Sequence, residues 1–333
     1  MVRWREIQTV MRGAGVVSIV AAGAFVSLLA SFGGDDAGHT ADAARRVRRD
    51  AVAGPRPEQS TGSVLIAVGD IADCGTSTDA ATAALVQDIA GTVATLGDNV
   101  YTSGSMKEFA KCYTPTWGAM LERTRPAPGN HDYGTRGAKG YFNYFGGAAG
   151  DRGEGYYSYE LGDWHIIAIN SNCGDIGGCE ASSPQGRWLR KDLAANSAEC
   201  TLAYWHHPLF SSGKEHGGEE AMRPFWTLLY NAGADVVLSA HEHNYERFMP
   251  QDPKGRPDSA RGIRQFVVGT GGADLYQFGR PLRTSEVRNA ETFGVLVLNL
   301  RQTGYDWDFV PVEPSSAQRN ARSFSDAGSG DCH

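Results

Sequence analysis

Five short apolar runs in this sequence each end in a polar or histidine residue, and this recurring layout constrains the fold more than any other feature. The runs are strand-like, and most are rich in the apolar residues of buried strands. In chain order they lead to Asp70, to Asp98 and Tyr101, to Asn130 and His131, to His206, and to His241 and His243. In open sheets of α and β elements, ligands gather beyond the carboxyl ends of the strands. We therefore expect these side chains to share one site.

The order of the remaining elements predicts an α/β fold. Between the first two runs, Ser77-Thr78-Asp79 can cap a helix that stops at Gly91, which makes a right-handed βαβ unit. Further helices are expected over 105–110, 116–123, 184–195 and 222–232, a strand pair over 156–161 and 164–170, and an ordered glycine-rich loop over 134–155. Strands over 265–268, 293–300 and 305–310 have no helices between them, so we expect them to form a second mixed sheet facing the first.

The side chains that follow the strands form a typical metal-binding inventory. Oxygen and imidazole nitrogen without thiolate suit hard or borderline metal ions. Seven candidates are too many for one catalytic ion, whereas two ions that share a bridging carboxylate would use all of them: Asp70, Asp98, Tyr101, Asn130, His206, His241 and His243. Paired metal ions are a known solution for phosphoester chemistry.

The ordered motifs resemble those of the calcineurin-like metallophosphoesterases. They stand here as Asp70-Ile71-Ala72, Gly97-Asp98, Gly129-Asn130-His131-Asp132, His206 followed two residues later by Pro208, and Ala240-His241-Glu242-His243. The resemblance covers roughly residues 64–248. It implies a four-layer α/β/β/α sandwich of two mixed sheets.

Two positions indicate which subfamily of these enzymes the sequence resembles. Ala72 stands where most of the family has a histidine ligand, and Tyr101 follows Asp98 by three residues, where it can replace that ligand. This exchange is similar to the purple acid phosphatases, in which a tyrosine phenolate binds ferric iron, and with the export signal described below it indicates a secreted bacterial member. The alternative for Tyr101 is a packing aromatic near a strand end.

The resemblance also implies a role for each residue. Asp70, Tyr101 and His243 would hold Fe(III), and Asn130, His206 and His241 would hold a divalent ion (Fe, Zn or Mn), with Asp98 as the bridge. A metal-bound hydroxide would attack a phosphomonoester in line, and His131 and His216 would assist the leaving group. Asp132 and Glu242 are expected to hydrogen-bond the ligands. His216 could equally be an exposed histidine. His207 is expected to be packed or to lie directly behind the ligands, and His165 is expected to be structural.

Two other functions fit the same motifs. A phosphodiesterase or nucleotide hydrolase would use the same metals, because specificity lies in loops such as residues 134–155. A metal-binding or phosphate-binding surface protein without turnover is the alternative outside enzymes. The sequence indicates no oligomeric state.

The N-terminal region predicts export. Residues 1–32 begin with three arginines and continue as an uncharged, mostly apolar run, which is typical of a secretory signal peptide or, if uncleaved, a membrane anchor. Residues 33–62 have the composition of a disordered linker. Residues 63–312 form the predicted catalytic domain, and residues 313–333 a C-terminal tail, mobile except near Cys332. Contact with a membrane is expected only through an uncleaved N-terminal segment, so the protein is predicted to be secreted or in the cell envelope.

The six cysteines follow the export signal and allow fifteen pairings. None has metal-ligand spacing beside the motif residues, so an oxidising compartment favours disulfides. We expect Cys74 to pair with Cys112, because this bond would tie the loops after the first two strands, and Cys173 with Cys179 as a local link. Cys200 and Cys332 remain as the third pair.

The charge of the chain bears on its partners. Residues 1–59 carry eight arginines against six acidic residues, a net charge of +2, whereas the whole chain carries −7, which leaves −9 for residues 60–333. An acidic body does not favour binding to long nucleic acid, which depends on neutralising many phosphates. A small phosphoester is therefore the expected substrate.

Overall fold

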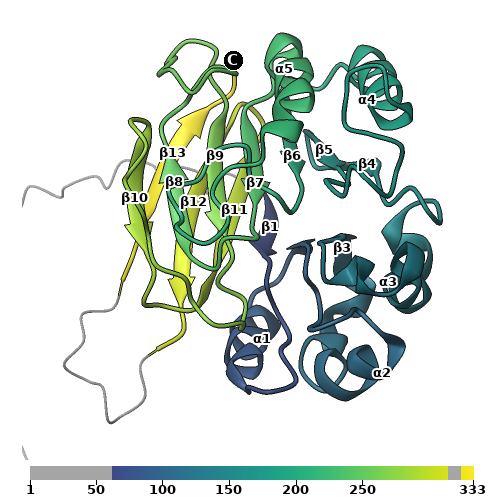
Figure 1. Ribbon diagram of the computed structural model, residues 1–333. Coiled ribbons are helices and arrows are strands. Elements are labelled where there is room, and N and C mark those ends of the chain that lie inside the picture. Colours follow the sequence, from purple (N-terminus) through teal and green to yellow (C-terminus); the bar gives the residue numbers. More distant parts are fainter. Residues whose placement is uncertain (1–61, 314–323) are drawn as a thin grey trace, which may run out of the picture. The chain divides into compact units, whose positions relative to one another are not determined.

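The structure is a computed structural model that describes residues 62–313 and 324–333, all within one unit, Glu58–His333 (Figure 1). The predicted export signal or anchor and all of the predicted linker except Gly62 lie outside the described residues. Within the two described ranges, no helix has both the length and the hydropathy needed to cross a bilayer.

A six-stranded sheet carries the first three strands of the predicted site. Its order is β13-β12-β11-β1-β2-β3. The parallel strands are β1 (Ser63–Val68), β2 (Thr92–Leu96) and β3 (Thr124–Ala127). The antiparallel strands are β11 (Gly294–Arg301), β12 (Gly304–Pro311) and β13 (Ala327–Asp331).

A seven-stranded sheet carries the other two site strands, in the order β10-β8-β9-β7-β6-β5-β4. Its parallel strands are β5 (Trp164–Ala168), β6 (Cys200–Tyr204), β7 (Val236–Ser239) and β9 (Arg264–Val268). Antiparallel to their neighbours are β4 (Tyr157–Leu161), β8 (Tyr245–Phe248) and β10 (Ser285–Asn289).

The two sheets face each other across the main core, and helices cover their outer faces (Figure 1). Alternation along β5 shows the layering, because Ile166 belongs to the core between the sheets and Ile167 to a second core. Leu189 of α4 (Pro184–Ala195) and Trp226 of α5 (Arg223–Ala232) fill that second core. On the other side, α1 (Thr78–Asp88) packs Val86 against the six-stranded sheet. The predicted fold of two mixed sheets with outer helices is confirmed.

The other helical segments are short and connect these layers. They are α2 (Met106–Glu108), η1 (Phe109–Tyr113), η2 (Trp117–Arg123), η3 (Asp132–Gly134), η4 (Arg136–Ala138), α3 (Lys139–Phe145), η5 (Gly146–Ala149) and η6 (Glu220–Met222).

The region 134–155, predicted to be a loop, is largely helical instead. Within α3, Tyr141, Phe142 and Phe145 are buried at helical spacing in the main core. Burial of three aromatic rings outweighs the low helix propensity of the surrounding glycines.

The predicted partition of the C-terminal strands is wrong. Of the three strands expected to form a second sheet of their own, only β9 lies in the seven-stranded sheet, whereas β11 and β12 continue the first sheet beside β1. Strand β13 extends that sheet through residues predicted to be a mobile tail, since Ala327–Asp331 pairs with β12. Residues 314–323 lie outside the described part.

All three predicted disulfides are confirmed: Cys74–Cys112, Cys173–Cys179 and Cys200–Cys332. The first joins the loop after β1 to η1. The last joins the start of β6 to the residue after β13, so it links the two sheets covalently. Three disulfides are typical of proteins outside the reducing cytosol.

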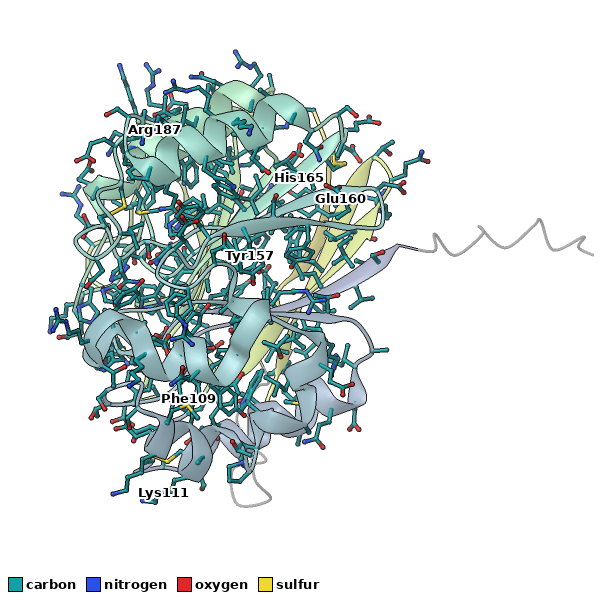
Figure 2. All side chains as sticks on the ribbon, turned by 90° about the vertical axis from the view of Figure 1, so that its right-hand side faces the viewer. Phe109, Lys111, Tyr157, Glu160, His165 and Arg187 are labelled. Carbon is teal, nitrogen blue, oxygen red and sulfur yellow. A yellow bond between two sulfur atoms is a disulfide. The ribbon has the colours of Figure 1, made fainter. Side chains whose placement is uncertain are left out.

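His165 is structural, as predicted. Its Nδ1 lies 2.8 Å from Oε1 of Glu160 on β4, and its Nε2 lies 2.8 Å from Oδ2 of Asp192 on α4. Figure 2 shows His165 and Glu160 on adjacent strands at this edge of the sheet. The imidazole thus connects two strands to the helix that covers them.

Candidate metal centre

The predicted ligands follow β1, β2, β3, β6 and β7, and the structure brings them together. These strands run parallel within their sheets, so their carboxyl ends point to the same edge. One ligand atom each from Asp70, Asp98 and His206 lies within 4.8 Å of the other two. Asp70 and Asp98 follow strands of the six-stranded sheet and His206 follows a strand of the seven-stranded sheet, so this cluster joins the two sheets.

Oxygen and nitrogen atoms with lone pairs converge around His206. Its Nδ1 lies 2.9 Å from the carbonyl oxygen of Leu96, which can only accept, so Nδ1 carries a proton and Nε2 has a free lone pair whenever the ring is neutral. That Nε2 lies 3.0 Å from Oδ1 of Asn130 and 3.2 Å from Nδ1 of His241. A carboxylate oxygen of Asp98 lies 3.3 Å away. Such a group of lone pairs requires a proton or a cation in its midst.

A second group forms around Tyr101. The Tyr101 hydroxyl lies 2.9 Å from Oδ1 of Asp70 and 3.0 Å from Nε2 of His243. The Nδ1 of His243 lies 2.7 Å from the carbonyl oxygen of Asp274, which again leaves the Nε2 lone pair facing the site. A hydroxyl has one hydrogen, so it cannot satisfy both neighbours. This donor set of carboxylate, phenol and imidazole fits a second metal ion.

Asp98 lies where the two groups meet. Its Oδ1 accepts the backbone N–H of His131 at 2.8 Å, and its Oδ2 faces His206. Burial, Asp70 and Asp98 together raise the pKa of Tyr101 well above its ordinary value. A shared carboxylate in this position fits the predicted bridge between two ions.

The electrostatics of the site favour added positive charge. Burial alone would raise the pKa of Asp98, but His206 and His131 hold it below its ordinary value. Burial would likewise lower the pKa of His206, yet Asp98 raises it to about 9. Burial and His206 together lower the pKa of His241. Without metal, a second proton on His206, at Nε2, supplies one positive charge, and metal ions would displace that proton and supply more.

Backbone strain is concentrated at the predicted ligands. Asp70, Asp98 and His241 have φ values of 58°, 48° and 70°, and in the described residues the only other non-glycine residue with positive φ is Ala138. Each such conformation costs of the order of 1 kcal/mol and persists where the surroundings fix it, commonly at functional sites.

Two glycines of the motifs allow the ligands to approach each other. A Cβ on Gly97 would lie 2.6 Å from Nδ1 of His206, and a Cβ on Gly129 would lie 2.1 Å from Oδ1 of Asp98. Neither position has room for a side chain. Only glycine fits at these two positions, which explains on steric grounds why a glycine precedes the ligand in the Gly-Asp and Gly-Asn motifs.

The two predicted leaving-group histidines reach solvent beside candidate ligands. His131 is half-exposed, with its Nδ1 2.7 Å from the carbonyl oxygen of Thr102 and its Nε2 4.0 Å from Oδ2 of Asp98. The exposed His216 stacks on His241 with ring centroids 4.2 Å apart. Both are therefore near the candidate ligands, and their roles stay predictions.

The expected hydrogen bonds from Asp132 and Glu242 to the ligand side chains are wrong. Asp132 instead accepts the backbone N–H of Gly129 at 2.9 Å and the side-chain amide of Asn99 at 3.0 Å. Burial and Asp98 raise the pKa of Asp132 to about 7. Glu242 accepts the backbone N–H groups of His216 and Gly217, each at 2.6 Å. Asp132 thus joins its loop to Asn99, and Glu242 joins its loop to His216 and Gly217. Each carboxylate therefore fixes loops that carry residues of the site.

Two further residues lie beside the centre: Tyr276, which was not assigned to it from the sequence, and His207, which was expected to be packed or to lie directly behind the ligands. Tyr276 stacks on His243 with ring centroids 4.0 Å apart. The ring centroid of His207 lies 4.4 Å from that of His241, and Nδ1 of His207 lies 2.7 Å from the hydroxyl oxygen of Ser171. One ring nitrogen each of His206, His207 and His241 lies within 4.8 Å of the others. The position of His207 agrees with the expectation, whereas Tyr276 lies in no motif.

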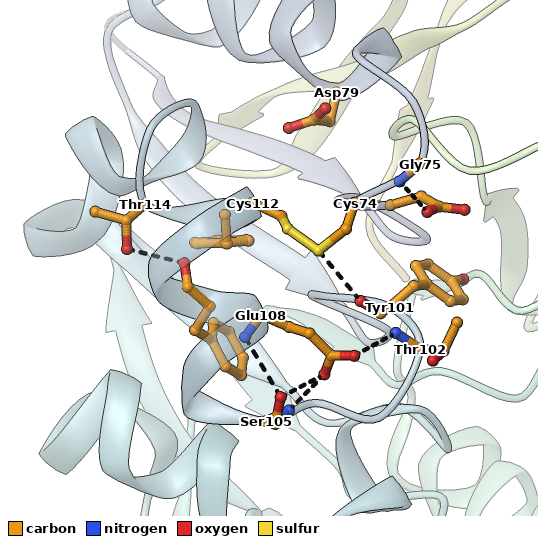
Figure 3. Close-up of a disulfide and its surroundings, with 12 residues drawn as sticks. Cys74, Gly75, Asp79, Tyr101, Thr102, Ser105, Glu108, Cys112 and Thr114 are labelled. Carbon is orange, nitrogen blue, oxygen red and sulfur yellow. Dashed lines mark hydrogen bonds between the residues drawn. A yellow bond between two sulfur atoms is a disulfide. The ribbon is translucent and has the colours of Figure 1, made fainter.

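Glu108 was also missed, and it supports the segment after Tyr101. Its carboxylate accepts the backbone N–H of Thr102 at 3.0 Å and that of Ser105 at 2.9 Å, beside the Cys74–Cys112 disulfide (Figure 3). Burial would raise the pKa of Glu108, but the bonds from Ser105 and its neighbours lower it to about 2. The disulfide and this carboxylate therefore brace the loop that presents Tyr101.

Comparison with known proteins agrees with this geometry. The family profile described as calcineurin-like phosphoesterase matches residues 38–245, more than half of the sequence. The chain belongs to this family.

Individual relatives and solved structures add detail to this comparison. Purple acid phosphatase 21 of Arabidopsis thaliana is 29% identical over 190 residues, which are 54% of this chain and 42% of that relative. The chain thus spans less than half the length of this relative. A purple acid phosphatase from yellow lupin (Lupinus luteus) seeds has a similar fold, with a TM-score of 0.62 at 17% identity, over 83% of this chain and 55% of that one. A dimetal phosphatase from Danio rerio matches with a TM-score of 0.51 at 10% identity, over 77% of this chain and 100% of that one.

Proposed function

We propose that this protein is a phosphomonoesterase of the purple acid phosphatase type, with two metal ions at the site described above. The observation that carries the proposal is the convergence of lone pairs around His206 and around Tyr101, joined by Asp98. The purple acid phosphatases among its relatives support the phosphatase activity. The acidic body of the chain favours a small phosphoester over long nucleic acid.

The residues divide into two sets. Asp70, Tyr101 and His243 would hold Fe(III), since a phenolate is a hard anionic donor. Asn130, His206 and His241 would hold Fe, Zn or Mn as a divalent ion, and Asp98 would belong to both sets. When bound, the two ions would lower the pKa of water and neutralise charge on the phosphoryl group.

The protein's own groups would complete the chemistry. The carbonyl groups of Leu96 and Asp274 keep His206 and His243 in the tautomer that presents Nε2 to the site. His131 and His216, which reach solvent, would hold a proton near the departing alcohol oxygen. The disulfides support an extracytoplasmic location.

Hydrolysis of p-nitrophenyl phosphate, compared with its bis ester, tests this function. We expect faster turnover of the monoester, loss of activity after chelation, and recovery when iron and a divalent ion are restored. A preference for the diester would show a phosphodiesterase. Binding of metal and phosphate without product would show a non-catalytic protein.

Asp98→Asn gives the matching test of the site. Because Asp98 faces both ligand groups, this variant should lose bound metal and hydrolysis together, as measured by metal analysis and steady-state assay. The variant Asp163→Asn, an exposed carboxylate in the turn between β4 and β5, serves as the control. Full activity in Asp98→Asn would contradict the bridging role.

A further inference from the structure

A pocket of about 270 Å³ lies beside the candidate metal centre. Its lining includes Ser171, Asn172, Asp175, His207 and Glu219. His207 forms the wall that the pocket shares with the centre. The His207 ring faces the pocket lining and also lies 4.4 Å, between ring centroids, from His241.

Hydrogen bonds hold the inner wall of this pocket in place. The hydroxyl of Ser171 lies 2.7 Å from Nδ1 of His207 and accepts the backbone N–H of the same residue at 3.1 Å. Asn172 is buried and donates its side-chain amide to the carbonyl oxygen of Pro128 at 3.2 Å. The Cys173–Cys179 disulfide closes the adjoining turn. The pocket is therefore formed before any ligand arrives.

The charge of the lining discriminates between ligands. Asp175 and Glu219 are exposed carboxylates, and the residues that line the pocket include no lysine or arginine. A group with its own negative charge would be repelled there, whereas a neutral or cationic group would not. The volume suits a small organic group rather than a nucleotide.

We propose that this pocket receives the leaving group of the phosphoester, and that this leaving group is a small alcohol without negative charge. The inference rests on the proposed phosphatase function. Hydrolysis consumes one water, breaks the phosphorus–oxygen bond to the alcohol, and releases inorganic phosphate and the alcohol with a proton on its oxygen. Esters whose leaving group carries further phosphate are poor substrates for electrostatic reasons.

Steady-state kinetics of the metal-loaded protein test the charge argument. The panel is glycerol 2-phosphate and O-phosphoethanolamine against ATP and pyrophosphate at fixed ionic strength. In Asp175→Asn with Glu219→Gln, the ratio of kcat/KM for ATP or pyrophosphate to kcat/KM for glycerol 2-phosphate should rise by about 3-fold to 10-fold per carboxylate. The Glu219→Gln change keeps a side-chain oxygen that can accept the Ala221 N–H, as the carboxylate of Glu219 does now. Asp163→Asn, remote from the pocket lining, is the charge control.

A second variant tests occupancy of the pocket. Ala221 lines it and is exposed, so Ala221→Tyr should fill it without disturbing the core. We expect a KM for glycerol 2-phosphate at least about 10-fold higher, with inhibition by inorganic phosphate unchanged, because phosphate has no leaving group.

The outcomes separate the two proposals. Hydrolysis with ester preferences that none of these variants alters would overturn the leaving-group assignment alone. A parallel loss of phosphate inhibition in Ala221→Tyr would also overturn it, since the pocket would then act through the centre. Failure to hydrolyse any ester of the panel or p-nitrophenyl phosphate would overturn the proposed function and this inference with it.

Discussion

Tyr101 is the residue that distinguishes a ferric centre from other paired-metal centres. Burial, Asp70 and Asp98 raise the pKa of its phenol well above the ordinary value, so the phenol stays protonated unless a strongly acidic cation displaces the proton. Fe(III) is such a cation, and phenolate-to-iron charge transfer absorbs visible light. Protein loaded with iron should therefore be pink or purple, and Tyr101→Phe should lose the band in a visible spectrum.

A matched control separates this effect from loss of any nearby tyrosine. The hydroxyl of Tyr133 accepts the side-chain amide of Asn170 at 2.8 Å and faces none of the candidate ligands in the described hydrogen bonds. Tyr133→Phe should keep the colour. A colourless but fully active iron-loaded wild type would show that Tyr101 is only a packing residue.

His216 provides a second prediction at the same scale. It stacks on His241, but its ring makes no described hydrogen bond to a candidate ligand, so it should act on the leaving group and not on metal binding. His216→Ala should keep its metal content and lose roughly 10²-fold to 10⁴-fold in rate, the usual contribution of a general acid. The loss should be smaller for p-nitrophenol than for an alkyl alcohol. Equal losses for both leaving groups would count against this role.

At the scale of single residues, the sequence indicates which residues gather but not what holds them. The strand endings place Asp70, Asp98 and His206 together because parallel strands share an edge. The partners of Glu242 and Asp132 could not be predicted, since a buried carboxylate bonds whichever backbone N–H groups the loops bring to it. Tyr276 reaches the site from a loop without a motif.

At the scale of elements, His165 joins β4, β5 and α4, and this gives a pH-dependent stability. Burial would lower the pKa of His165, but its bonds to Asp192 and Glu160 raise it above the ordinary value. The stabilisation is fully present below the unfolded-state pKa of about 6.5, and it is lost as the pH rises through the folded-state pKa.

Denaturant unfolding at several pH values above about 6.5, at constant metal concentration, checks this prediction. The wild type should lose stability with rising pH by at most about 1.4 kcal/mol per pH unit from this group, and His165→Gln should lose that part of the slope. Glu160→Gln, which removes one of the two partners, should reduce the slope only in part. An unchanged slope in His165→Gln would contradict the prediction.

The elements themselves were predictable where chain-local patterns decide them. Helix α4 matches its predicted bounds because Ser183 accepts the N–H of Gly186 at its start and Pro184 occupies the first turn. The pairing of β11 with β1 was not predictable, because an apolar run has the same pattern in either sheet. In α3, the burial of aromatic side chains stabilises a helix, whereas the glycine content of the region led to the wrong prediction of a loop.

At the scale of the whole molecule, the two sheets are joined both by the cluster of polar candidate ligands and by a disulfide. The candidate ligands come from both sheets, and the Cys200–Cys332 disulfide joins the sheets through residues 132 positions apart. Cys173–Cys179 spans only 6 positions, within one loop. A disulfide stabilises mainly by restricting the unfolded chain, and its effect grows with the length of the closed loop.

The two bonds should therefore differ in their effect on the free energy of unfolding. Loop-closure entropy gives about 5 kcal/mol for Cys200–Cys332 and about 2 kcal/mol for Cys173–Cys179. Replacing both cysteines of a pair by serine, and measuring urea unfolding with metals present, should show the larger loss for the first pair. The Cys173–Cys179 variant is the matched control because it also removes two buried or half-buried sulfur atoms. Equal losses would mean that β13 and Cys332 add little to the union of the sheets, and that the shared metal centre and the core between the sheets hold them together without the covalent link.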